Sequence, residues 1–442
     1  MTLAEMRRDA VACFAAAMDA VEPGRLVDTQ LFREGGTVCL GTPEAGVVAR
    51  HAGPVVVVGA GKAARKMAEA SARVAGRALC GGIVIVPHGS ELSSIGAVTV
   101  AAGGHPVPDA AGEAATRRLQ EVVGGADGST LVVVVLGGGA SALMVAPAAG
   151  IDLRDKQEIT RRLLFAGADI EALNTVRKHC SQVKGGGLLR AAGRAGGVWT
   201  LLLSDVVGDD PAIIGSGPTV ADPTTFATAA RVLARFLAPA DVPPTVREHL
   251  ERGRRGLVVE TVKPGDPVLA RTRTVRIGGN RDAVRAAARE AERRGYRTTV
   301  LPEALRGDAA EAGRAVVARL AAASGDRPRA IVAGGETTVR VAPEGRGGRC
   351  QQLALAAAVA LAGVPAVLLA AGTDGVDGPT DAAGACIDGE TTARARARDF
   401  TPDAALSRTD SHPLLDATGD LVRTGPTGTN VADLVVALRA AC

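Results

Sequence analysis

The hydrophobic positions of this chain fall into short runs without polar alternation, and most runs end at glycine or acidic residues. Runs of this kind are typical of parallel strands covered by helices on both faces of the sheet. The predicted strands are Pro54–Val58, Gly82–Pro87, Ala97–Ala101, Leu131–Leu136, Val198–Leu203, Ala330–Ala333 and Ala366–Ala371. The pattern predicts an α/β fold with a larger N-terminal, parallel-sheet, Rossmann-like αβα domain and a smaller C-terminal α/β domain.

Amphipathic segments between these runs predict the covering helices. Asp109 is the predicted N-cap of one of them, because an Asp side chain there accepts a hydrogen bond from a free amide of the first turn. The predicted helices are residues 3–21, a helix ending near Val74, a helix from Asp109 to Val123, Leu153–Ala166 and Leu173–Ala192.

A change of composition divides the chain into two domains. From about Leu237 to Pro267 the sequence is rich in proline and charge, as segments between domains often are. At 442 residues the chain is long enough for two separate cores. The predicted domains are residues 1–240 and 268–442, with residues 241–267 as the linker. The second domain is predicted to contain strands Thr274–Ile277, Thr298–Leu301 and Val339–Val341, whereas Leu434–Leu438 is too short to distinguish helix from strand.

Composition argues against several classes of function. The net charge of +4 is small and only 2% of residues are aromatic, so nothing indicates a nucleic-acid surface. No stretch of about 20 apolar residues lacks charges or helix breakers, and the N-terminal segment does not fit a signal peptide. Seven scattered cysteines without a C-x-x-C pair fit a reducing compartment. We expect a cytoplasmic protein without a membrane or nucleic-acid partner; the sequence leaves the oligomeric state open, a homodimer included.

Two glycine-rich turns follow predicted buried strands and open helices, which is the layout of phosphate-binding loops. The turns are Gly59-Ala60-Gly61-Lys62 and Gly137-Gly138-Gly139-Ala140-Ser141. The first turn matches neither the Walker A spacing nor the dinucleotide fingerprint, which requires a third glycine. The second turn predicts an anion nest, with close packing between helix and strand as the alternative.

Basic residues near these turns are candidates for ligand binding. Only six of the 51 basic residues are lysine, and Lys62 stands where a helix begins. Because a helix N-terminus already carries positive partial charge, a cation there indicates that an anion joins it; a solvated surface lysine is the competing interpretation. His105 is either a ligand contact or a structural loop residue. For Lys178 and Lys184, on a predicted basic helix, a solvated helix face is the preferred interpretation.

Acidic loops follow two other predicted strands. Asp205 and Asp209 follow the last predicted strand of the first domain, and Asp374 and Asp377 follow a strand of the second. Open α/β sheets place their sites at the carboxyl ends of strands, and carboxylates suit Mg²⁺. An Asx-turn is the alternative for any single Asp. Two such loops are compatible with one cleft between the domains to which each contributes carboxylates.

Taken together, these motifs resemble those of the glycerate 2-kinase family, whose second domain is called the MOFRL domain. Their order and spacing carry the resemblance over nearly the whole chain. They are Gly59–Ala64, Gly104–Asp109, Leu136–Ser141, Asn174–Gly186, Leu203–Pro218, Gly334–Thr337, Gly347–Gln352, Gly372–Ala385 and Thr424–Val431. The resemblance implies an active site in the cleft between a larger parallel-sheet domain and a smaller MOFRL domain. It also implies ATP- and Mg²⁺-dependent phosphorylation of D-glycerate to 2-phosphoglycerate.

The functional pair of that family is a lysine in Gly-Lys-Ala-Ala and an arginine in Gly-Gly-Arg, which fall on Lys62 and Arg349. The family usually has Asn-Gln-Glu after this arginine, whereas this chain has Cys350-Gln351-Gln352. It also has Ala432 where the family typically has an asparagine. The family's glutamate could orient the arginine or bind a water of the metal's shell. In that case the neutral amide of Gln352 takes over this role here, and we expect a slower enzyme or a different preferred acceptor.

The resemblance and the loops together assign the site residues. Lys62 is predicted to neutralise the transferring group, and Arg349 to hold either the carboxylate of the acceptor or the γ-phosphate of ATP. Asp209 is the candidate general base. The predicted ATP-binding residues are Gly59, Gly61, Gly137, Gly138, Gly139 and Ser141. Asp205 and Asp374 are the predicted Mg²⁺ ligands, and the predicted substrate-binding residues are His105, Arg177 and Asp377.

Two other functions are weighed against the kinase. A nicotinamide-dependent hydroxypyruvate reductase is disfavoured, because no G-x-G-x-x-G precedes an acidic ribose ligand about 20 residues on. A non-catalytic binding protein on the same scaffold is disfavoured by the presence of Lys62, Arg349 and both acidic loops. ATP hydrolysis stimulated by glycerate would distinguish the kinase from the binding protein.

Overall fold

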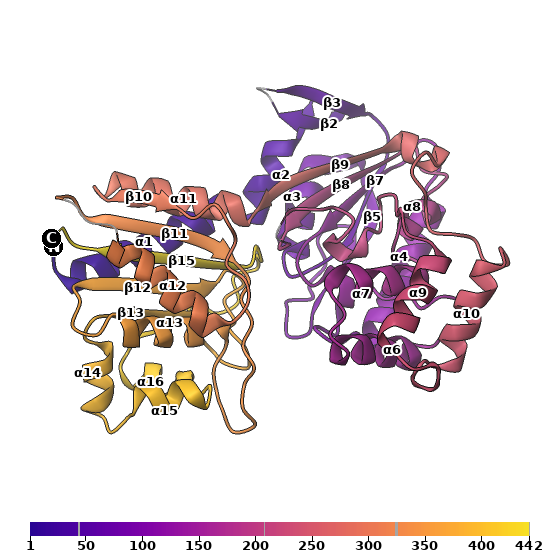
Figure 1. Ribbon diagram of the computed structural model, residues 1–442. Helices are drawn as coiled ribbons and strands as arrows, with labels where there is room; N and C mark the ends of the chain where they lie inside the picture. Colours follow the sequence, from indigo (N-terminus) through magenta and orange to yellow (C-terminus); the bar gives the residue numbers. More distant parts are fainter. Residues whose placement is uncertain (43–44, 207, 323–325, 442) are drawn as a thin grey trace. The chain divides into compact units, whose positions relative to one another are not determined.

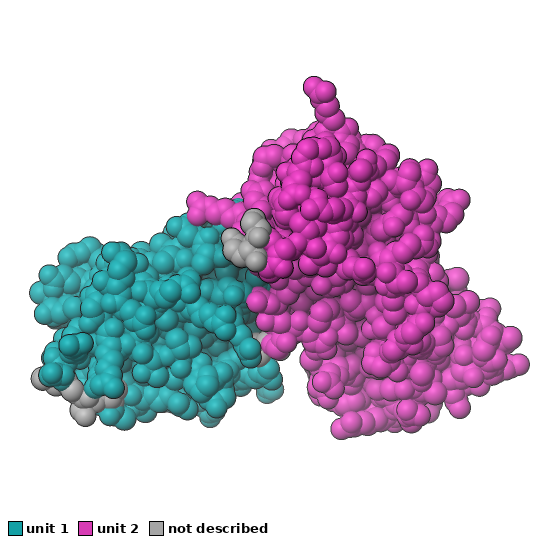
Figure 2. Space-filling view, turned by 90° about the horizontal axis from the view of Figure 1, so that it is seen from above, with its two compact units in different colours: residues 1–22, 278–442 teal, residues 23–277 magenta. Residues whose placement is uncertain are grey.

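The computed structural model describes all residues of the chain except 43–44, 207, 323–325 and 442. The chain forms two compact units (Figure 2). Unit 1 consists of Met1–Glu22 and Gly278–Cys442, and unit 2 of Pro23–Ile277. None of the described helices is long and apolar enough to cross a membrane.

The N-terminal helix belongs to the same unit as the C-terminal half of the chain, which differs from the predicted first domain of residues 1–240. Helix α1 (Leu3–Ala20) packs its apolar stripe against α11 (Asn280–Arg293) and β12 (Ala366–Gly372) (Figure 1). Arg7 adds ion pairs to the buried carboxylates of Asp388 at 2.6 Å and Asp420 at 2.8 Å. The apolar spacing predicted a helix correctly, but spacing carries no information about which core a helix covers.

The predicted linker, residues 241–267, also differs from the structure, because it is part of unit 2. It contains α10 (Pro244–Arg254), whose Val246 and Leu250 are buried in a core shared with α9 (Phe226–Phe236). The prolines precede or begin this helix, and its charged residues lie mostly on the exposed face. The proline and charged residues of this segment therefore belong to a surface helix and its start, not to a linker between domains.

Unit 2 is built on a six-stranded sheet in the order β6-β5-β4-β7-β8-β9, and the pairs among β4 to β8 are parallel. Its strands are β4 (Val55–Ala60), β5 (Leu79–Pro87), β6 (Val98–Gly103), β7 (Leu131–Leu136), β8 (Gly197–Ser204) and β9 (Thr272–Gly279). Numbered within the sheet, this order is 3-2-1-4-5-6, that of the doubly wound dinucleotide-binding fold. The predicted Rossmann-like parallel sheet is confirmed, but predicted strand Thr274–Ile277 lies in this sheet, as part of β9, instead of in the second domain.

Helices cover the sheet where the amphipathic pattern predicted them. The helices on the sheet are α3 (Ala64–Ala75), α4 (Ala110–Gly125) and α5 (Ala140–Leu143), whereas α6 (Leu153–Phe165) packs with α7 (Ile170–His179) and α10 in a separate helical core. Asp109 is the N-cap of α4, since its side chain accepts a hydrogen bond from the amide of Gly112 at 2.8 Å. Before the sheet come α2 (Pro23–Gln30) and a small antiparallel sheet of β1 (Leu31–Glu34), β2 (Thr37–Thr42) and β3 (Gly46–His51).

The prediction of one continuous helix over Leu173–Ala192 is wrong. The structure has α7 (Ile170–His179), an irregular turn, and α8 (Gly187–Ala191). Gly185 and Gly186, just before α8, have φ values of 54° and 79°, a left-handed conformation that a continuous right-handed helix does not contain. A Cβ on Gly186 would lie 2.4 Å from Val262 Cβ, so the turn also needs glycine for packing.

Unit 1 contains a second six-stranded sheet in the order β10-β11-β15-β12-β13-β14. Strands β10 and β11 are parallel and the other neighbours antiparallel. Its strands other than β12 are β10 (Arg297–Val300), β11 (Arg329–Gly335), β13 (Gly384–Asp388), β14 (Leu421–Val422) and β15 (Asp433–Arg439). Segment Leu434–Leu438 is thus a strand, whereas residues 339–341 form none, contrary to prediction.

Helices lie on both faces of this sheet (Figure 1). α12 (Ala309–Ala322) and α13 (Arg349–Ala360) build one core with it, while α1 and α11 pack on its other side. The remaining helices are α14 (Thr391–Arg396), α15 (Pro402–Ser407) and α16 (Ser411–Ala417).

Candidate functional site

The loops after β4 and β7 meet at the point of the first sheet where the chain reverses its direction of winding. Strand β4 lies between β5 and β7, so the chain builds outward from it first to one side and then to the other. In open α/β sheets the crevice at such a switch point, outside the carboxyl ends of the strands, is the usual ligand site. The structure thus places both predicted glycine turns of the sequence at one location.

Backbone contacts lock the two turns together. The amide of Lys62 donates to the carbonyl of Gly138 at 2.9 Å, and the amide of Gly137 donates to the carbonyl of Ala60 at 3.2 Å. A Cβ on Gly61, which has a φ of 136°, would lie 2.8–2.9 Å from backbone atoms of Gly137. The close approach therefore requires glycine at position 61, and it fixes the backbone of Lys62 beside the second turn.

The second turn presents amide groups without protein acceptors. Among the described residues, no hydrogen-bond acceptor pairs with the amides of Gly138 and Gly139. Gly138 is buried, and Gly139 has a left-handed φ of 85°. Consecutive amides of this kind form a nest that binds anions, and an unpaired buried amide is costly without a ligand. The predicted anion nest thus has donors available, although its role in ATP binding stays a prediction.

Two predicted site residues border this nest. The ring of His105 lies over Gly139, because a Cβ on that glycine would be 2.8 Å from His105 Cδ2. The hydroxyl of Ser141 is 2.7 Å from that of Ser216, which donates to Asn174 Oδ1 at 3.0 Å. Asn174 and Ser216 are buried polar residues that the sequence did not single out individually. The structure brings together Lys62, His105, the glycines and Ser141.

A cavity of about 650 Å³ adjoins the second turn through Ser141. Its volume falls within the usual range for small-molecule sites, about 300–1,000 Å³. Its polar lining includes Ser141, Arg154, Lys156, Gln157, Glu158, Arg161, Arg177 and Lys184. Glu158 is already paired with Arg161 and Arg162. We call this space the basic cavity, because its lining carries more cations than anions.

Three cations of the basic cavity, the buried Lys156 and Lys184 and the partly exposed Arg177, lie without a carboxylate partner among the described residues. The ammonium of Lys184 donates to the carbonyls of Ser141 at 2.8 Å and Met144 at 3.3 Å. That of Lys156 donates to the carbonyl of Cys180 at 2.7 Å, and the guanidinium of Arg177 has no hydrogen-bond partner in the described part of the chain. Burial, and then the charges of Lys156 and Arg177, hold the pKa of Lys184 well below its ordinary value. Uncompensated buried cations are unfavourable, so the cavity is suited to an anionic ligand.

The interpretation of Lys178 and Lys184 as solvated residues is wrong. Both are buried, Lys184 in the basic cavity and Lys178 at 3.4 Å from Asp222. Spacing along a helix does not reveal this, because the helix is interrupted and its flank is covered by residues 258–263. A usable signal was the scarcity of lysine: three of the chain's six lysines, Lys156, Lys178 and Lys184, are buried.

The burial of Lys156 is expected to make stability depend on pH. Burial lowers the pKa of Lys156 to about 8, whereas the unfolded chain has the ordinary value near 10.4. Between these values the unfolded state binds more protons, so this contribution to the free energy of unfolding rises with pH. We expect wild type to gain about 2 kcal/mol relative to Lys156→Met between pH 7 and 9.5, measured by urea unfolding of both proteins. A constant difference between them would contradict the burial of a charged Lys156.

The acidic loop after β8 keeps Asp205 and Asp209 partly exposed. Asp209 has a left-handed φ of 57°, which Asp tolerates better than most residues. Its Oδ2 lies 3.6 Å from Arg276 Nε. Val207, in the same predicted motif, lies outside the described residues. The assignments of Asp205 to Mg²⁺ and Asp209 to proton abstraction stay predictions.

In unit 1, Arg349 begins α13 and is held by two carboxylates. Its guanidinium binds Asp433 through Nε at 2.6 Å and through the second nitrogen at 2.9 Å, and Glu336 at 2.8 Å. Burial lowers the pKa of Arg349, but the hydrogen bonds to Asp433 outweigh this and raise it overall. Arg349 is therefore a fixed cation with two of its five N–H groups left for other acceptors. The sequence did not predict Asp433 or Glu336 as its partners.

Asp377 has a structural role at the start of the same helix. Its carboxylate accepts hydrogen bonds from the amides of Cys350 at 3.0 Å and Gln351 at 2.8 Å, and from the Gln351 side chain at 3.0 Å. It is 3% exposed, and burial raises its pKa to about 6 against the lowering effect of these bonds. The substrate-binding role predicted for Asp377 stays a prediction, since the carboxylate already caps α13.

The unusual Gln352 does not contact Arg349. Its side-chain nitrogen donates to the carbonyl of Leu406 at 2.9 Å, and its buried oxygen has no hydrogen-bond partner among the described residues. Asp433 and Glu336 orient Arg349 in this chain. The replacement of the family's usual glutamate therefore leaves the position of Arg349 intact, and the slower enzyme expected from it has no structural support at Arg349.

Mg²⁺ ligands are not gathered in a ready-made site. Among the residues that the structure describes, no group of three or more His, Cys, Asp or Glu side chains is placed to hold a metal ion. Asp374 Oδ1 accepts a hydrogen bond from the amide of Val376 at 3.1 Å. Mg²⁺ that enters with a nucleotide takes most of its ligands from phosphate and water and only one or two from carboxylates. These residues therefore fit a Mg²⁺ ion that arrives bound to the nucleotide better than one held permanently by the protein.

Ala432 has a strained backbone next to Asp433. It has a φ of 64°, which costs an L-residue about 1–2 kcal/mol, and it is 4% exposed. We expect Ala432→Gly to raise the free energy of unfolding by about 0.5–1 kcal/mol in urea, after the greater flexibility of glycine in the unfolded chain is subtracted. Ala437→Gly on β15 is the matched control and should destabilise, because φ at Ala437 is not positive. Equal losses in both variants would argue against strain at Ala432.

The fold and the site define a class of protein: a doubly wound α/β unit with a glycine turn of available amides at its switch point, joined to a second α/β unit. Comparisons with known proteins narrow this class. Residues 9–251 match the family described as domain of unknown function DUF4147, and residues 329–433 match the MOFRL family.

Relatives of this chain carry two kinds of name. A putative hydroxypyruvate reductase of Agrobacterium vitis is 42% identical over 394 residues, 87% of both chains. A glycerate 2-kinase of Pyrococcus horikoshii is 38% identical over 392 residues, also 87% of both chains. The crystal structure of glycerate kinase from Thermotoga maritima matches with a TM-score of 0.84 and 34% identity, over 99% of this chain and 100% of that one. The chain belongs to the glycerate 2-kinase family with a MOFRL domain, as its motifs predicted.

Proposed function

We propose that this protein is a glycerate 2-kinase, which transfers the γ-phosphoryl group of ATP to the 2-hydroxyl of D-glycerate. The observation that carries the proposal is the contact between the Lys62 turn and the glycine turn with two unpaired amides. Relatives named glycerate 2-kinase and D-glycerate 2-kinase support the reaction. Phosphoryl transfer depends on positioning and charge neutralisation, and this turn supplies both kinds of group.

In this mechanism the phosphates of ATP bind the amides of Gly138 and Gly139, with Gly59, Gly61, Gly137 and Ser141 shaping the turn. Lys62 neutralises charge that develops on the transferring group, and Arg349 acts as a second cation. Mg²⁺, with a carboxylate of Asp205 or Asp374 among its ligands, supplies further charge neutralisation when bound. The predicted position of the active site between the domains stays a prediction.

Glycerate is anionic, and the basic cavity offers a cation for its carboxylate. Arg177 is suited to this role, since a guanidinium binds a carboxylate with two parallel hydrogen bonds. His105 borders both the cavity's Pro106 and the glycine turn, so it is placed to contact the same substrate. Asp209 is the proposed base for the 2-hydroxyl.

Product identification tests the proposal. The protein is incubated with ATP, Mg²⁺ and D-glycerate, and enolase is added without phosphoglycerate mutase. Immediate formation of phosphoenolpyruvate, seen by its absorbance, is expected only if the 2-hydroxyl is phosphorylated. ADP without this signal would indicate transfer to the 3-hydroxyl or plain hydrolysis, and would contradict the proposal.

The reductase named among the relatives is the second candidate function. Against it, the first turn lacks the third glycine of the dinucleotide fingerprint, and β5 contains no Asp or Glu to bind a ribose hydroxyl. The same preparation, given hydroxypyruvate and NADH or NADPH, should therefore show no oxidation of the nicotinamide. Oxidation without ADP formation in the kinase assay would favour the reductase.

A further inference from the structure

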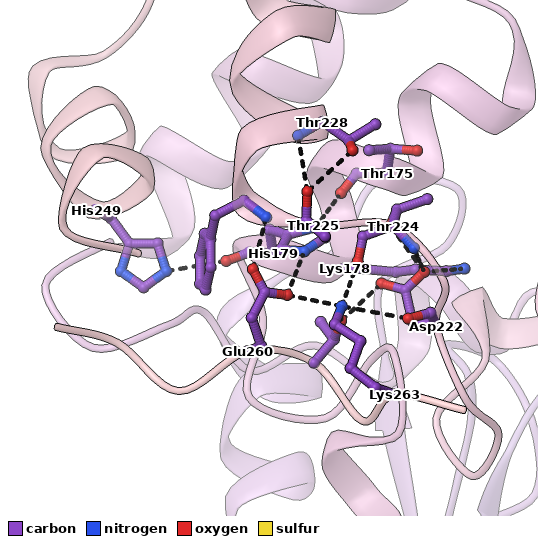
Figure 3. Close-up of polar contacts among 12 residues, drawn as sticks. Thr175, Lys178, His179, Asp222, Thr224, Thr225, Thr228, His249, Glu260 and Lys263 are labelled. Carbon is purple, nitrogen blue, oxygen red and sulfur yellow. Dashed lines mark hydrogen bonds and ion pairs between the residues drawn. The ribbon is translucent and has the colours of Figure 1, made fainter. Parts of the chain in front are cut away.

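A second cavity of about 230 Å³ lies beside the segment that was predicted as a linker. Its walls come from the end of α7, the glycine turn at 185–187, α10 and residues 258–261. Figure 3 shows the polar side chains around it, including Lys178, His179, His249 and Glu260. Lys184 separates it from the basic cavity: it lines both, but its ammonium donates to the carbonyls of Ser141 and Met144.

Lys178 is a buried ammonium with unused donors. Its side chain is 8% exposed, and its one hydrogen bond in the described structure goes to Asp222 Oδ1 at the long distance of 3.4 Å. That oxygen is better bound by Thr224, whose amide and hydroxyl donate at 3.1 and 2.8 Å. An ammonium has three N–H groups, so two remain without a described acceptor. Leaving them so in a buried site is costly, and Lys178 is among the residues that line the cavity, although its ammonium also lies beside Asp222.

The rest of the lining adds positive charge. Arg190 and Arg252 are exposed members of the lining, and the imidazoles of His179 and His249 lie deeper. Glu260 is the one acidic residue among the described lining residues. Its carboxylate is already bound by Lys263 at 2.7 Å and by the amide of Phe226 at 2.8 Å. The cavity is therefore electrostatically suited to an anion.

Size limits the class of ligand. A volume of 230 Å³ is below the usual range of about 300–1,000 Å³ for drug-sized ligands, and a nucleotide would not fit. A small oxyanion with several acceptor oxygens can satisfy Lys178 and reach the arginines. We propose that this cavity is a separate binding site for a phosphoryl group, either inorganic phosphate or a short phosphate monoester.

Binding here would act on the segment that closes the cavity. Val262 donates its amide to the carbonyl of Gly185 at 3.0 Å, and Thr261 donates its hydroxyl to Asp222 Oδ2 at 2.9 Å. Residues 258–263 therefore hold the glycine turn that follows Lys184. A phosphoryl group on Lys178 would tie α7, this turn and the segment together, and so stabilise the wall of the basic cavity.

Histidine NMR provides a site-specific test without ATP or glycerate, so it is independent of the kinase proposal. The chain has only six histidines, and selective ¹³C labelling makes each ring visible. We expect saturable shifts of the His179 and His249 signals on addition of inorganic phosphate, and at least tenfold weaker binding in Lys178→Met. Arg177→Met is the matched control: it changes the neighbouring residue, which faces the basic cavity, and should leave these shifts intact.

Two further arms identify the ligand and protect the test against misfolding. Titration with 2-phosphoglycerate in place of phosphate shows whether the ester binds more tightly than the free anion. If Lys178→Met does not fold, Arg252→Ala, which removes an exposed side chain, should still weaken binding. Unchanged His179 and His249 signals at about 10 mM phosphate, roughly ten times a Kd of about 1 mM, would overturn the proposal. Signal shifts in Lys178→Met equal to those in wild type would overturn it as well.

Discussion

Lys62→Ala should lower kcat for glycerate phosphorylation by about 10³-fold or more, by analogy with other cations that neutralise a transferring phosphoryl group. The backbone amide of Lys62, which binds Gly138, is retained in the variant, so the turn should keep its shape. A cation that acts mainly in the transition state changes kcat more than KM. The measurement is steady-state kinetics with the enolase-coupled assay, at varied ATP and varied glycerate.

Lys66→Ala is the matched control, because Lys66 lies in the first turn of α3, which follows the Lys62 turn, and has similar exposure. This control should keep close to wild-type activity. Thermal unfolding of both variants should give transitions near that of wild type. Near-full activity in Lys62→Ala would remove the main support for the catalytic assignment.

Arg349→Ala should likewise lower kcat by about 10³-fold or more. It should also destabilise unit 1, since it leaves the buried carboxylate of Asp433, whose side chain is 9% exposed, without its cation. Because Arg349 itself is about one-third exposed, we expect a loss of about 2 kcal/mol, less than the 3–5 kcal/mol of a fully buried broken pair. Activity and urea unfolding therefore have to be measured on the same preparation.

Two variants separate the catalytic from the structural effect. Arg349→Lys keeps a positive charge beside Asp433 but loses the two-pronged contact, and should recover most of the stability and little of the activity. Arg293→Ala removes an arginine of unit 1 that is 69% exposed and, among the described residues, is paired with Glu290 alone, and it should change neither. A folded Arg349→Ala protein with near wild-type kcat would exclude a catalytic role for this arginine.

Local patterns in the sequence predicted the sheet of unit 2 well. The valine-rich runs became β4 and β7, because residues buried on both faces of a parallel strand leave no polar alternation. The cap of α4 by Asp109 was predicted for the same local reason, since capping involves neighbours in sequence. The glycine turns were recognised because their order, strand then glycine then helix, is visible along the chain.

Contacts between distant residues were not visible in this way. The interpretation of Lys178 and Lys184 as solvated failed because segments distant in sequence surround them. The carbonyls of Ser141 and Met144 bind Lys184, and Asp222 pairs with Lys178. The assignment of residues 241–267 as a linker rested on composition, which does not show that Val246 and Leu250 face a core. The scarcity of lysine in this chain was a signal that could have pointed to the buried lysines, but it was not used for them.

By itself, the sequence determined the α/β class, the glycine turns and the positions of Lys62 and Arg349 beside their motifs. These depend on periodicity, on glycine's freedom of φ and on short-range order, all of which are local. The tertiary structure alone decided that α1 belongs to unit 1 and that Asp433 and Glu336 hold Arg349. It also decided that Lys156, Arg177 and Lys184 of the basic cavity have no carboxylate partner among the described residues. The reason is physical: burial and charge compensation depend on which distant segments pack together. The local pattern of a segment does not specify which other segments it will contact.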